Sequence, residues 1–402
     1  MDIVVQKFGG SSVADAEKLK NAAKRIVDAY DSGKFVVVVV SAQGDTTDEL
    51  LEKAKQVNPA ASKREMDMLL STGEQISMSL LAMTIEAMGY PVVSLTGWQA
   101  GISTNSKYSC SRIKKVDTER ILRELDSKRI VIVAGFQGIN KFDDITTLGR
   151  GGSDTTAVAL AAALHAQVCE IYTDVDGIYT ADPRIVENAK KLKNISYDEM
   201  LELSSLGANV LQNRSVEMAL KYNVKLEVKS SFEKIPGTVI KEVEKVEKMI
   251  VRGVTKDDNI VLVSIVNIEN TPGKAFKIFS LLARENINID VILQSVGRGG
   301  TKDITFTVDF DNAATAVRVL KENLSALGAD SVEYTENVSK VSVVGAGMAS
   351  NPGVAALMFE ALSDVGININ MISTSEIKIS VLIDQKDSKN AVRAIHDKFN
   401  LA

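Results

Sequence analysis

A short motif near the N-terminus combines the parts of a phosphate-binding turn. Residues 7–12, KFGGSS, follow an apolar run at 3–5 and precede a helical pattern over about 15–30. Adjacent glycines let backbone N–H groups approach an anion, the start of the helix adds partial positive charge, and Lys7 supplies a full charge. A plain strand-to-helix turn with an exposed lysine has the same sequence, so the motif needs support from elsewhere in the chain.

A second candidate turn, TLGRGGSD at 147–154, lies between a predicted strand and a predicted helix. The guanidinium of Arg150 offers the planar fork that suits a carboxylate, and Ser153 or Asp154 can cap the helix. Asp154 could instead pair with Lys7 and hold it in place. A helix-capping turn is the alternative, but two such turns in one α/β domain favour an anion-handling active site.

A third stretch, TDVDGIYTADPR at 173–184, follows another predicted strand, where open α/β sheets bind ligands. We interpret it as a nucleotide-contacting loop, with Tyr179 against the base or ribose and Arg184 near phosphates. A polar turn stopped by Asp-Pro is the alternative. A calcium loop is excluded because no glutamate stands at the twelfth position from Asp174.

Glu74 lies in a small polar break, STGEQ at 71–75, within a strongly apolar helical segment. A single glutamate in a helix is more often a solvated surface residue than a ligand-binding one. We therefore assign Glu74 to a site only in combination with the other motifs.

Composition narrows the class of protein. The chain has 402 residues, 45% hydrophobic and 25% charged, which predicts two or three globular units. The net charge of -5 does not indicate the basic surface that binds nucleic acid. The sequence shows neither an apolar run of membrane-spanning length nor the layout of a signal peptide, so we expect a cytoplasmic enzyme. Two cysteines and two histidines form no metal pattern, so neither a protein metal site nor histidine acid-base chemistry is expected.

The first 231 residues alternate β-rich runs with helical patterns. Helices are predicted over 65–88 and 154–166, and from a capping box that begins at Ser196. Uninterrupted apolar runs predict central parallel strands at 35–41, 91–95, 130–134, 168–173 and 224–228. This pattern is typical of a layered α/β domain.

Beyond Pro236-Gly237 and a charged run at 241–248, the sequence repeats at an offset of 80 residues. Pro272-Gly273 recurs as Pro352-Gly353, and the INI at 287–289 recurs at 367–369. Each copy predicts a small βαββαβ unit, but the second copy ends before its last strand. We predict that an unclaimed strand at 249–255 completes it, so that no edge is left free. The expected domains are 1–240, 261–337, and 246–260 with 338–402.

Together, these motifs resemble, in order and spacing, those of aspartate kinases in the amino-acid kinase superfamily, with Ser41 and Thr47 among the matching positions. The tandem repeat resembles paired ACT regulatory domains, and the resemblance covers essentially the whole chain. It is closest to monofunctional bacterial enzymes that make a full-length and a short subunit; Met249 is a candidate internal start. The implied fold is α/β: a three-layer kinase domain with a mostly parallel sheet, then two ACT domains, the first inserted in the second.

The resemblance implies ATP- and Mg²⁺-dependent phosphorylation of the L-aspartate side chain to 4-phospho-L-aspartate, the first step toward lysine, threonine and methionine. The implied catalytic residues are Lys7 and Asp154. Aspartate would be held by Arg150, Glu74, Ser41, Thr47 and Thr147. The transferring phosphate and ATP would be surrounded by Lys7, Gly9, Gly10, Ser12, Ser153, Thr173, Asp174, Tyr179, Arg184 and Asn209. At position 209 the family usually has a lysine, so the departure puts ATP affinity in doubt.

The regulatory half resembles sites for threonine and lysine between ACT units of two subunits, which implies a homo-oligomer or a hetero-oligomer with the short subunit. The implied threonine pocket comprises Gly273, Ala275, Gln294, Asn368 and Ile369. The implied lysine pocket comprises Asp290, Ser375 and Glu376. Ala355 stands where a threonine is common, which makes lysine sensitivity the weaker expectation.

The chemistry suits these residues. The β-carboxylate of aspartate is ionised at neutral pH, so its attack on a phosphate needs no general base. Alignment and charge neutralisation by Lys7, Mg²⁺ and backbone amides would supply the catalysis. Two alternatives stay open: a kinase for another acid, such as glutamate or N-acetylglutamate, and a non-catalytic amino-acid sensor.

Overall fold

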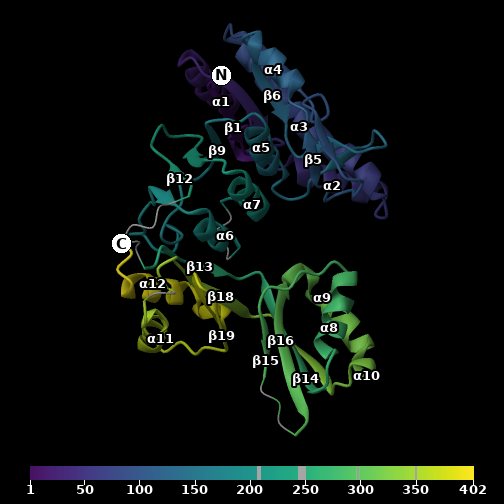
Figure 1. The fold of residues 1–402 in the computed structure, drawn as a ribbon, viewed down its shortest axis with the longest axis vertical. Coiled ribbons are helices and arrows are strands. Elements are labelled where there is room, and N and C mark those ends of the chain that lie inside the picture. Colours follow the sequence, from purple (N-terminus) through teal and green to yellow (C-terminus); the bar gives the residue numbers. More distant parts are fainter. Residues whose placement is uncertain (206–209, 243–249, 296, 298, 349–350) are drawn as a thin grey trace. The chain divides into compact units, whose positions relative to one another are not determined.

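The computed structural model describes residues 1–205, 210–242, 250–295, 297, 299–348 and 351–402 (Figure 1). The chain forms two compact units. The first contains the described residues of 1–179, 191–205 and 209–246. The second contains 180–190 and the described residues from 247 to the C-terminus.

An eight-stranded sheet in the order β10-β12-β11-β9-β1-β2-β6-β3 forms the middle of the first unit. Every neighbouring pair is parallel except β11 with β12, which confirms the predicted mostly parallel sheet. The strands are β1 (Ile3–Phe8), β2 (Phe35–Val40), β3 (Val92–Leu95), β6 (Ile130–Ala134), β9 (Val168–Thr173), β10 (Asn194–Ile195), β11 (Leu226–Ser230) and β12 (Thr238–Ile240).

Helices cover both faces of this sheet. The helices of the unit are α1 (Ala16–Asp31), α2 (Thr46–Val57), α3 (Lys63–Ala87), α4 (Glu119–Asp126), α5 (Gly152–Ala163), α6 (Tyr197–Ser205) and α7 (Asn213–Tyr222). Val4 and Phe8 of β1 pack with α1 and α3 in one apolar core. Lys7, which points to the other face because strand side chains alternate, contacts α5. The unit therefore has three layers, and ten residues of the apolar helix α5 are buried.

A small second sheet in the order β5-β4-β7-β8 adjoins these layers and was not predicted. Its strands are β4 (Ile102–Thr104), β5 (Ile113–Val116), β7 (Gln137–Ile139) and β8 (Ile145–Thr147). Strands of three or four residues are too short for an alternation of apolar and polar side chains to be distinguished from the surrounding loop sequence. The sheet matters because β8 leads directly into the turn at 147–154.

The second unit contains two four-stranded sheets, β15-β16-β14-β17 and β13-β18-β20-β19. The first sheet has β14 (Ile260–Glu269), β15 (Ile292–Gln294), β16 (Thr301–Asp309) and β17 (Ser331–Thr335), with α8 (Lys274–Arg284), α9 (Phe310–Glu322) and α10 (Leu324–Leu327). The second sheet has β13 (Gly253–Asp257), β18 (Val338–Val344), β19 (Met371–Thr374) and β20 (Lys378–Asp384), with α11 (Val354–Asp364) and α12 (Ser388–Lys398). Because β13 pairs with β18, the first repeat is inserted within the second.

Residues 180–190 belong to the second unit, although the sequence places them within the catalytic region. Ala181, Ile185 and Val186 are buried in the apolar core that contains the helices α11 and α12. Thr180 Oγ1 lies 3.0 Å from Nε2 of His396, which is fully buried. Ala181 and the adjacent pair Ile185-Val186, in a short and mostly polar stretch, give no indication in the sequence of which core they join.

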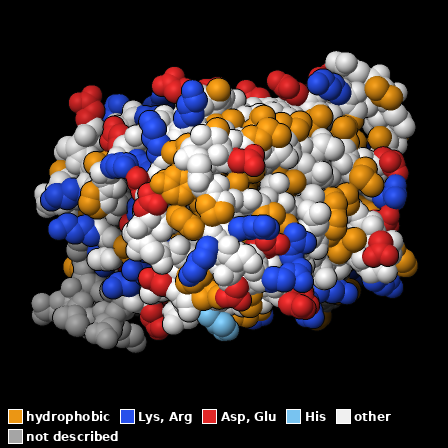
Figure 2. All heavy atoms as spheres, turned by 90° about the horizontal axis from the view of Figure 1, so that it is seen from above, with side chains coloured by type: hydrophobic (Ala, Val, Ile, Leu, Met, Phe, Trp, Pro, Cys, Tyr) orange, Lys and Arg blue, Asp and Glu red, His pale blue; other side chains and the backbone are white. Residues whose placement is uncertain are grey.

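The surface shows no field of a single charge on the face presented in Figure 2, where Lys and Arg side chains lie among Asp and Glu side chains. Among the described residues, no helix combines the length and apolar character needed to cross a bilayer.

Candidate active site

The turn after β1 brings together the residues predicted to surround a phosphate. Lys7 Nζ lies 2.7 Å from Asp154 Oδ1, so the ammonium group is held at the start of α5. The Gly9 N–H donates to the Tyr172 carbonyl at 3.1 Å, which fixes the turn to β9. A Cβ at Gly10 would lie 2.6 Å from the Ala42 carbonyl oxygen, so only glycine allows this close approach.

Ser12 joins the ends of three strands. Its hydroxyl lies 2.5 Å from the Ser231 hydroxyl, which in turn donates to the carbonyl of Thr173 at 3.0 Å. The ends of β1, β9 and β11 thereby meet at the carboxyl edge of the sheet, where ligands bind in open α/β folds. Ser231 was not predicted, because a serine beyond a strand carries no signal by itself.

The turn at 147–154 starts α5. Gly151 has a φ of +65°, and a Cβ there would lie 1.8 Å from the Gln212 side chain, so the position requires glycine. Ser153 follows in the first turn of α5, and Arg150 is exposed just before it. Arg214 donates to the carbonyls of Leu148 at 2.9 Å and Ser111 at 3.0 Å.

Arg214 was not predicted, because a single arginine in a helical segment carries no signal of its own in the sequence. Its two bonds position the turn while leaving the guanidinium of Arg150 accessible to a ligand.

Glu74 is buried on α3, contrary to the usual behaviour of a helical glutamate. Its Oε1 accepts the N–H of Ala42 at 3.2 Å, and Oε2 has no hydrogen-bond partner among the described residues. Burial raises the pKa of Glu74 to about 8, against the smaller opposing effect of backbone hydrogen bonds. A buried carboxyl with a free oxygen is suited to a cationic ligand group, such as an ammonium.

Asp67, two helical turns before Glu74 on α3, organises the neighbouring loops and was also missed. It is fully buried and accepts hydrogen bonds from the Thr147 N–H at 2.9 Å, the Thr147 hydroxyl at 2.7 Å and the Ser109 N–H at 2.9 Å. Its spacing of seven residues from Glu74 puts both on one helix face, and this was the available signal.

Two further predicted residues lie where β2 ends. Ser41 is half-buried, and its N–H donates to the Phe8 carbonyl at 3.1 Å, beside the phosphate turn. Thr47 is half-buried in the first turn of α2. The first unit therefore contains the predicted substrate and phosphate residues, with Glu74 on α3 and most of the others on turns or in the first turn of a helix.

The predicted nucleotide loop is divided between the two units. In the first unit, the Thr173 hydroxyl donates to Asp174 at 3.0 Å, and the Tyr179 hydroxyl donates to Asp176 at 2.8 Å. Arg184 lies in the second unit, is largely exposed and pairs with Asp182 at 2.8 Å. Arg184 therefore belongs to a different unit from Thr173, Asp174 and Tyr179, and Asn209 lies outside the described residues.

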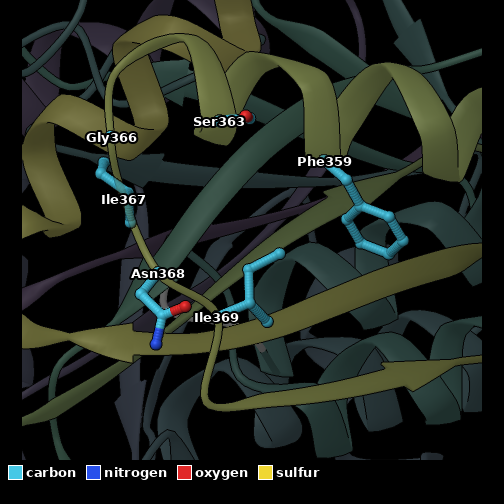
Figure 3. A pocket seen from close by; sticks show the side chains of 6 residues that line it. All are labelled: Phe359, Ser363, Gly366, Ile367, Asn368 and Ile369. Atoms are coloured by element: carbon cyan, nitrogen blue, oxygen red, sulfur yellow. The ribbon is translucent and has the colours of Figure 1, made fainter.

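The predicted effector residues occur in several places of the second unit. Asn368 and Ile369 line a cavity of about 370 Å³ together with Phe359 and Ile367 (Figure 3). Gly273 caps α8, Ala275 follows in that helix, Gln294 is exposed on β15, and Ser375 and Glu376 form the turn before β20.

Asp290 contacts the ammonium of Lys340, whose side chain is 2% exposed and also lies 3.8 Å from Asp257. The predicted lysine pocket thus already contains an internal cation. Elsewhere in the described chain, no cluster of three His, Cys, Asp or Glu side chains could hold a metal ion.

Comparisons with known proteins agree with this arrangement. The profile of the amino acid kinase family matches residues 2–230, and that of the ACT domain matches 263–324 and 341–399. The aspartokinase of Geobacillus stearothermophilus is 52% identical over all of this chain and 98% of its own length. The Corynebacterium glutamicum aspartokinase is 53% identical over all of this chain and 97% of its own length.

Solved structures show the same similarity. E. coli aspartokinase III in complex with aspartate and ADP (R-state) has a TM-score of 0.84 at 27% identity, covering 98% of this chain and 99% of its own. The same enzyme in complex with lysine and aspartate (T-state) has a TM-score of 0.78 at 27% identity, covering 99% of this chain and 100% of its own. The chain therefore belongs to the aspartokinase family, with an amino acid kinase fold followed by ACT domains.

Proposed function

We propose that the chain transfers the γ-phosphoryl group of ATP to the side-chain carboxylate of L-aspartate, forming 4-phospho-L-aspartate and ADP in the cytoplasm. The buried Glu74 with its unpartnered oxygen carries the proposal, because a substrate ammonium would complete it. Arg150, exposed on the adjoining turn, would bind the α-carboxylate. The E. coli relative in complex with aspartate and ADP supports the choice of both substrates.

Transfer would depend on position and charge. The attacking carboxylate is ionised at neutral pH and needs no base. Lys7, held by Asp154 at 2.7 Å beside the Gly9-Gly10 turn, would neutralise charge on the transferring phosphate. Ser12, Ser153, Thr173, Asp174 and Tyr179 would contact ATP in this proposal, while Asn209 and Arg184 stay predictions.

Mg²⁺ fits this site as part of the nucleotide complex. The described residues hold no three-ligand cluster, and Mg²⁺ is usually bound through one or two carboxylates, water and substrate phosphates. Bound in this way, the ion would neutralise phosphate charge. Asp154 and Asp174 are the nearby carboxylates available to such a complex or to its waters.

The test is ATP- and Mg²⁺-dependent acyl-phosphate formation, trapped as the hydroxamate, with L-aspartate, L-glutamate and N-acetylglutamate as acceptors. We expect turnover with aspartate. Turnover with N-acetylglutamate alone would contradict the role of Glu74, since that acid has no ammonium. Absence of turnover with all three, combined with tight threonine binding, would favour the amino-acid sensor.

We also propose that threonine acts through the second unit, with the cavity at Asn368 and Ile369 as part of its site. Lysine is the weaker candidate, because Lys340 already occupies Asp290. Lysine should nevertheless be tested as an effector, because the E. coli relative was solved in complex with lysine. Hydroxamate assays with threonine, lysine and both distinguish these possibilities.

Pairing of ACT units between subunits is part of this proposal. β15 lies at a sheet edge and exposes Ile292, Leu293 and Gln294, which would suit a second strand edge. Light scattering on the full chain would give the oligomeric state. The domain limits 1–240, 261–337, and 246–260 with 338–402, and a short subunit from Met249, stay predictions that limited proteolysis and mass spectrometry can test.

A further inference from the structure

A second cavity lies in the first unit, outside the residues assigned above. It measures about 420 Å³, within the size range of small-molecule pockets, and its lining includes Gln6, Arg25, Lys34 and Tyr172. Gln6 precedes Lys7 on β1, so its side chain points to the opposite face of the sheet from Lys7. The cavity is therefore separate from the phosphate turn and lies on the face that α1 covers.

A buried carboxylate fixes the orientation of the Gln6 side chain. Glu170 accepts hydrogen bonds from Gln6 Nε2 at 2.8 Å, the Tyr172 hydroxyl at 3.1 Å and Lys229 Nζ at 3.0 Å. Because an ionised carboxylate only accepts hydrogen bonds, the amide nitrogen of Gln6 must face it. The amide oxygen then points the other way.

That amide oxygen lacks a donor. Gln6 is 1% exposed, and its Oε1 forms no hydrogen bond with any described residue. Buried polar atoms without a partner are rare, and they call for an external donor such as water or a ligand. Gln6 lines the cavity, so a donor group of a ligand bound there is the partner that we infer for this oxygen.

The cavity also has an excess of positive charge. Lys229 is matched by Glu170 and Glu227, and Lys234 pairs with Asp28. Arg25 and Lys34 line the same cavity, and neither has an ion pair or hydrogen bond within the described ranges. The four cations of the lining outnumber its three carboxylates by one, which favours an anionic ligand group, with the guanidinium suited to bidentate binding.

The remaining walls are apolar. The ring of Tyr172 stacks on that of Phe8, with centroids 4.6 Å apart, and Ile235 and Pro236 complete the lining. We propose that this cavity binds a small organic anion, a carboxylate or a phosphate, that also carries an O–H or N–H group. The anion contacts Arg25 and Lys34, and the donor contacts Gln6 Oε1.

Calorimetric titration of the full chain tests this with two pairs of probes. L-malate carries one hydroxyl that succinate lacks, and glycerol 3-phosphate carries two hydroxyls that propyl phosphate lacks. We expect the donor-bearing member of at least one pair to bind about tenfold more tightly, the factor for one hydrogen bond. Binding of malate assigns a carboxylate ligand, and binding of glycerol 3-phosphate assigns a phosphate ligand.

Variants separate this cavity from the proposed active site. Arg25→Gln should weaken binding at least about tenfold, whereas Lys24→Gln, an exposed neighbour on α1, should not. Arg150→Gln should leave this binding intact, although it weakens aspartate binding in the kinase assay. Gln6→Leu should remove the preference for the hydroxylated probe.

Two results would overturn the proposal. One is no binding of any probe at about 10 mM, beyond the weak end of specific affinities. The other is binding that Arg25→Gln leaves unchanged. Because Arg25 forms no ion pair or hydrogen bond with any described residue, its variant is expected to fold, and the experiment does not depend on Gln6→Leu being stable.

Discussion

The hydroxyl of Thr147 donates a 2.7 Å hydrogen bond to Oδ1 of Asp67, eighty residues earlier in the chain. The same carboxylate binds the backbone N–H groups of Thr147 and Ser109. Asp67 therefore joins α3, which carries Glu74, to the turn that carries Arg150. One buried side chain, that of Asp67, therefore connects the elements that carry Glu74 and Arg150, the two residues proposed to hold aspartate.

Asp67→Asn should raise the KM for aspartate more than it lowers kcat. The amide cannot accept all three hydrogen bonds, and the loss of one or two such bonds to a charged group corresponds to about tenfold to a hundredfold. Steady-state kinetics would measure both constants. Thr72→Val, at an exposed position on α3, is the control. Equal KM values in Asp67→Asn and the parent would contradict this positioning role.

Aspartate binding should strengthen as pH rises toward 8. The pKa of Glu74 is about 8 in the ligand-free site because the carboxyl is buried, so the group is protonated at lower pH. Binding an ammonium requires the ionised form. The KM for aspartate should therefore fall by up to about tenfold per pH unit below 8 and then level off.

Glu74→Gln should abolish that pH dependence and raise the KM at pH 8. Glu86→Gln, an exposed glutamate on the same helix, should keep the parent profile. An unaltered profile in Glu74→Gln would assign the titration to another group.

Lys7→Ala should lower kcat by about a hundredfold to a thousandfold, the usual cost of losing one group that stabilises transition-state charge. Lys7 lies 2.7 Å from Asp154, so the protein itself sets the position of the ammonium group. Lys20→Ala, an exposed position on α1, should have full activity. An unchanged kcat in Lys7→Ala would reject the proposed role.

The sequence predicted those parts of the site that depend on local order. Central strands appear as apolar runs, glycine turns follow them, and the capping box at Ser196 forms with Glu199 as expected. Asp67, Arg214 and Ser231 act across long sequence separations, and an isolated aspartate, arginine or serine has many other uses. Contacts of this kind become visible only when the strands and loops have been placed.

Lys340→Met should increase sensitivity to lysine. Lys340 is 2% exposed between Asp257 and Asp290, so its removal leaves two carboxylates without their cation. An external ammonium could then bind Asp290 without displacing an internal one. Hydroxamate assays should show a lower half-inhibitory lysine concentration, with unchanged inhibition in Lys386→Met, which loses only an exposed partner of Asp384.

Lys340→Met should also lower the free energy of unfolding. Removing one partner of a buried charge pair costs up to about 3–5 kcal/mol. The cost is smaller here because the carboxylate of Asp290 is partly exposed. Added lysine should restore part of this loss in a thermal melt. A variant that is insensitive to lysine both in activity and in melting would exclude Asp290 from an effector site.

Stability of the second unit should fall as pH drops below about 6.5. Burial lowers the pKa of His396, outweighing the opposite effect of Asp397, so the imidazole is neutral in the folded chain. The unfolded chain, with an ordinary histidine pKa, takes up a proton first. The free energy of unfolding therefore begins to fall near pH 6.5 and continues to fall until the pH reaches the pKa of the folded state. The decrease is at most about 1.4 kcal/mol per pH unit.

Calorimetric melting of the parent and of His396→Gln at pH 7.5 and 5.5 would measure this dependence. Glutamine can still bond the Thr180 hydroxyl, which lies 3.0 Å from the imidazole Nε2, but it does not titrate. The variant should therefore lose less stability between the two pH values. His165→Asn is the matched control, since His165 is exposed and has a φ of +50°, a conformation that asparagine also accepts. If His165→Asn, and not His396→Gln, flattened the profile, the exposed histidine would be the titrating group.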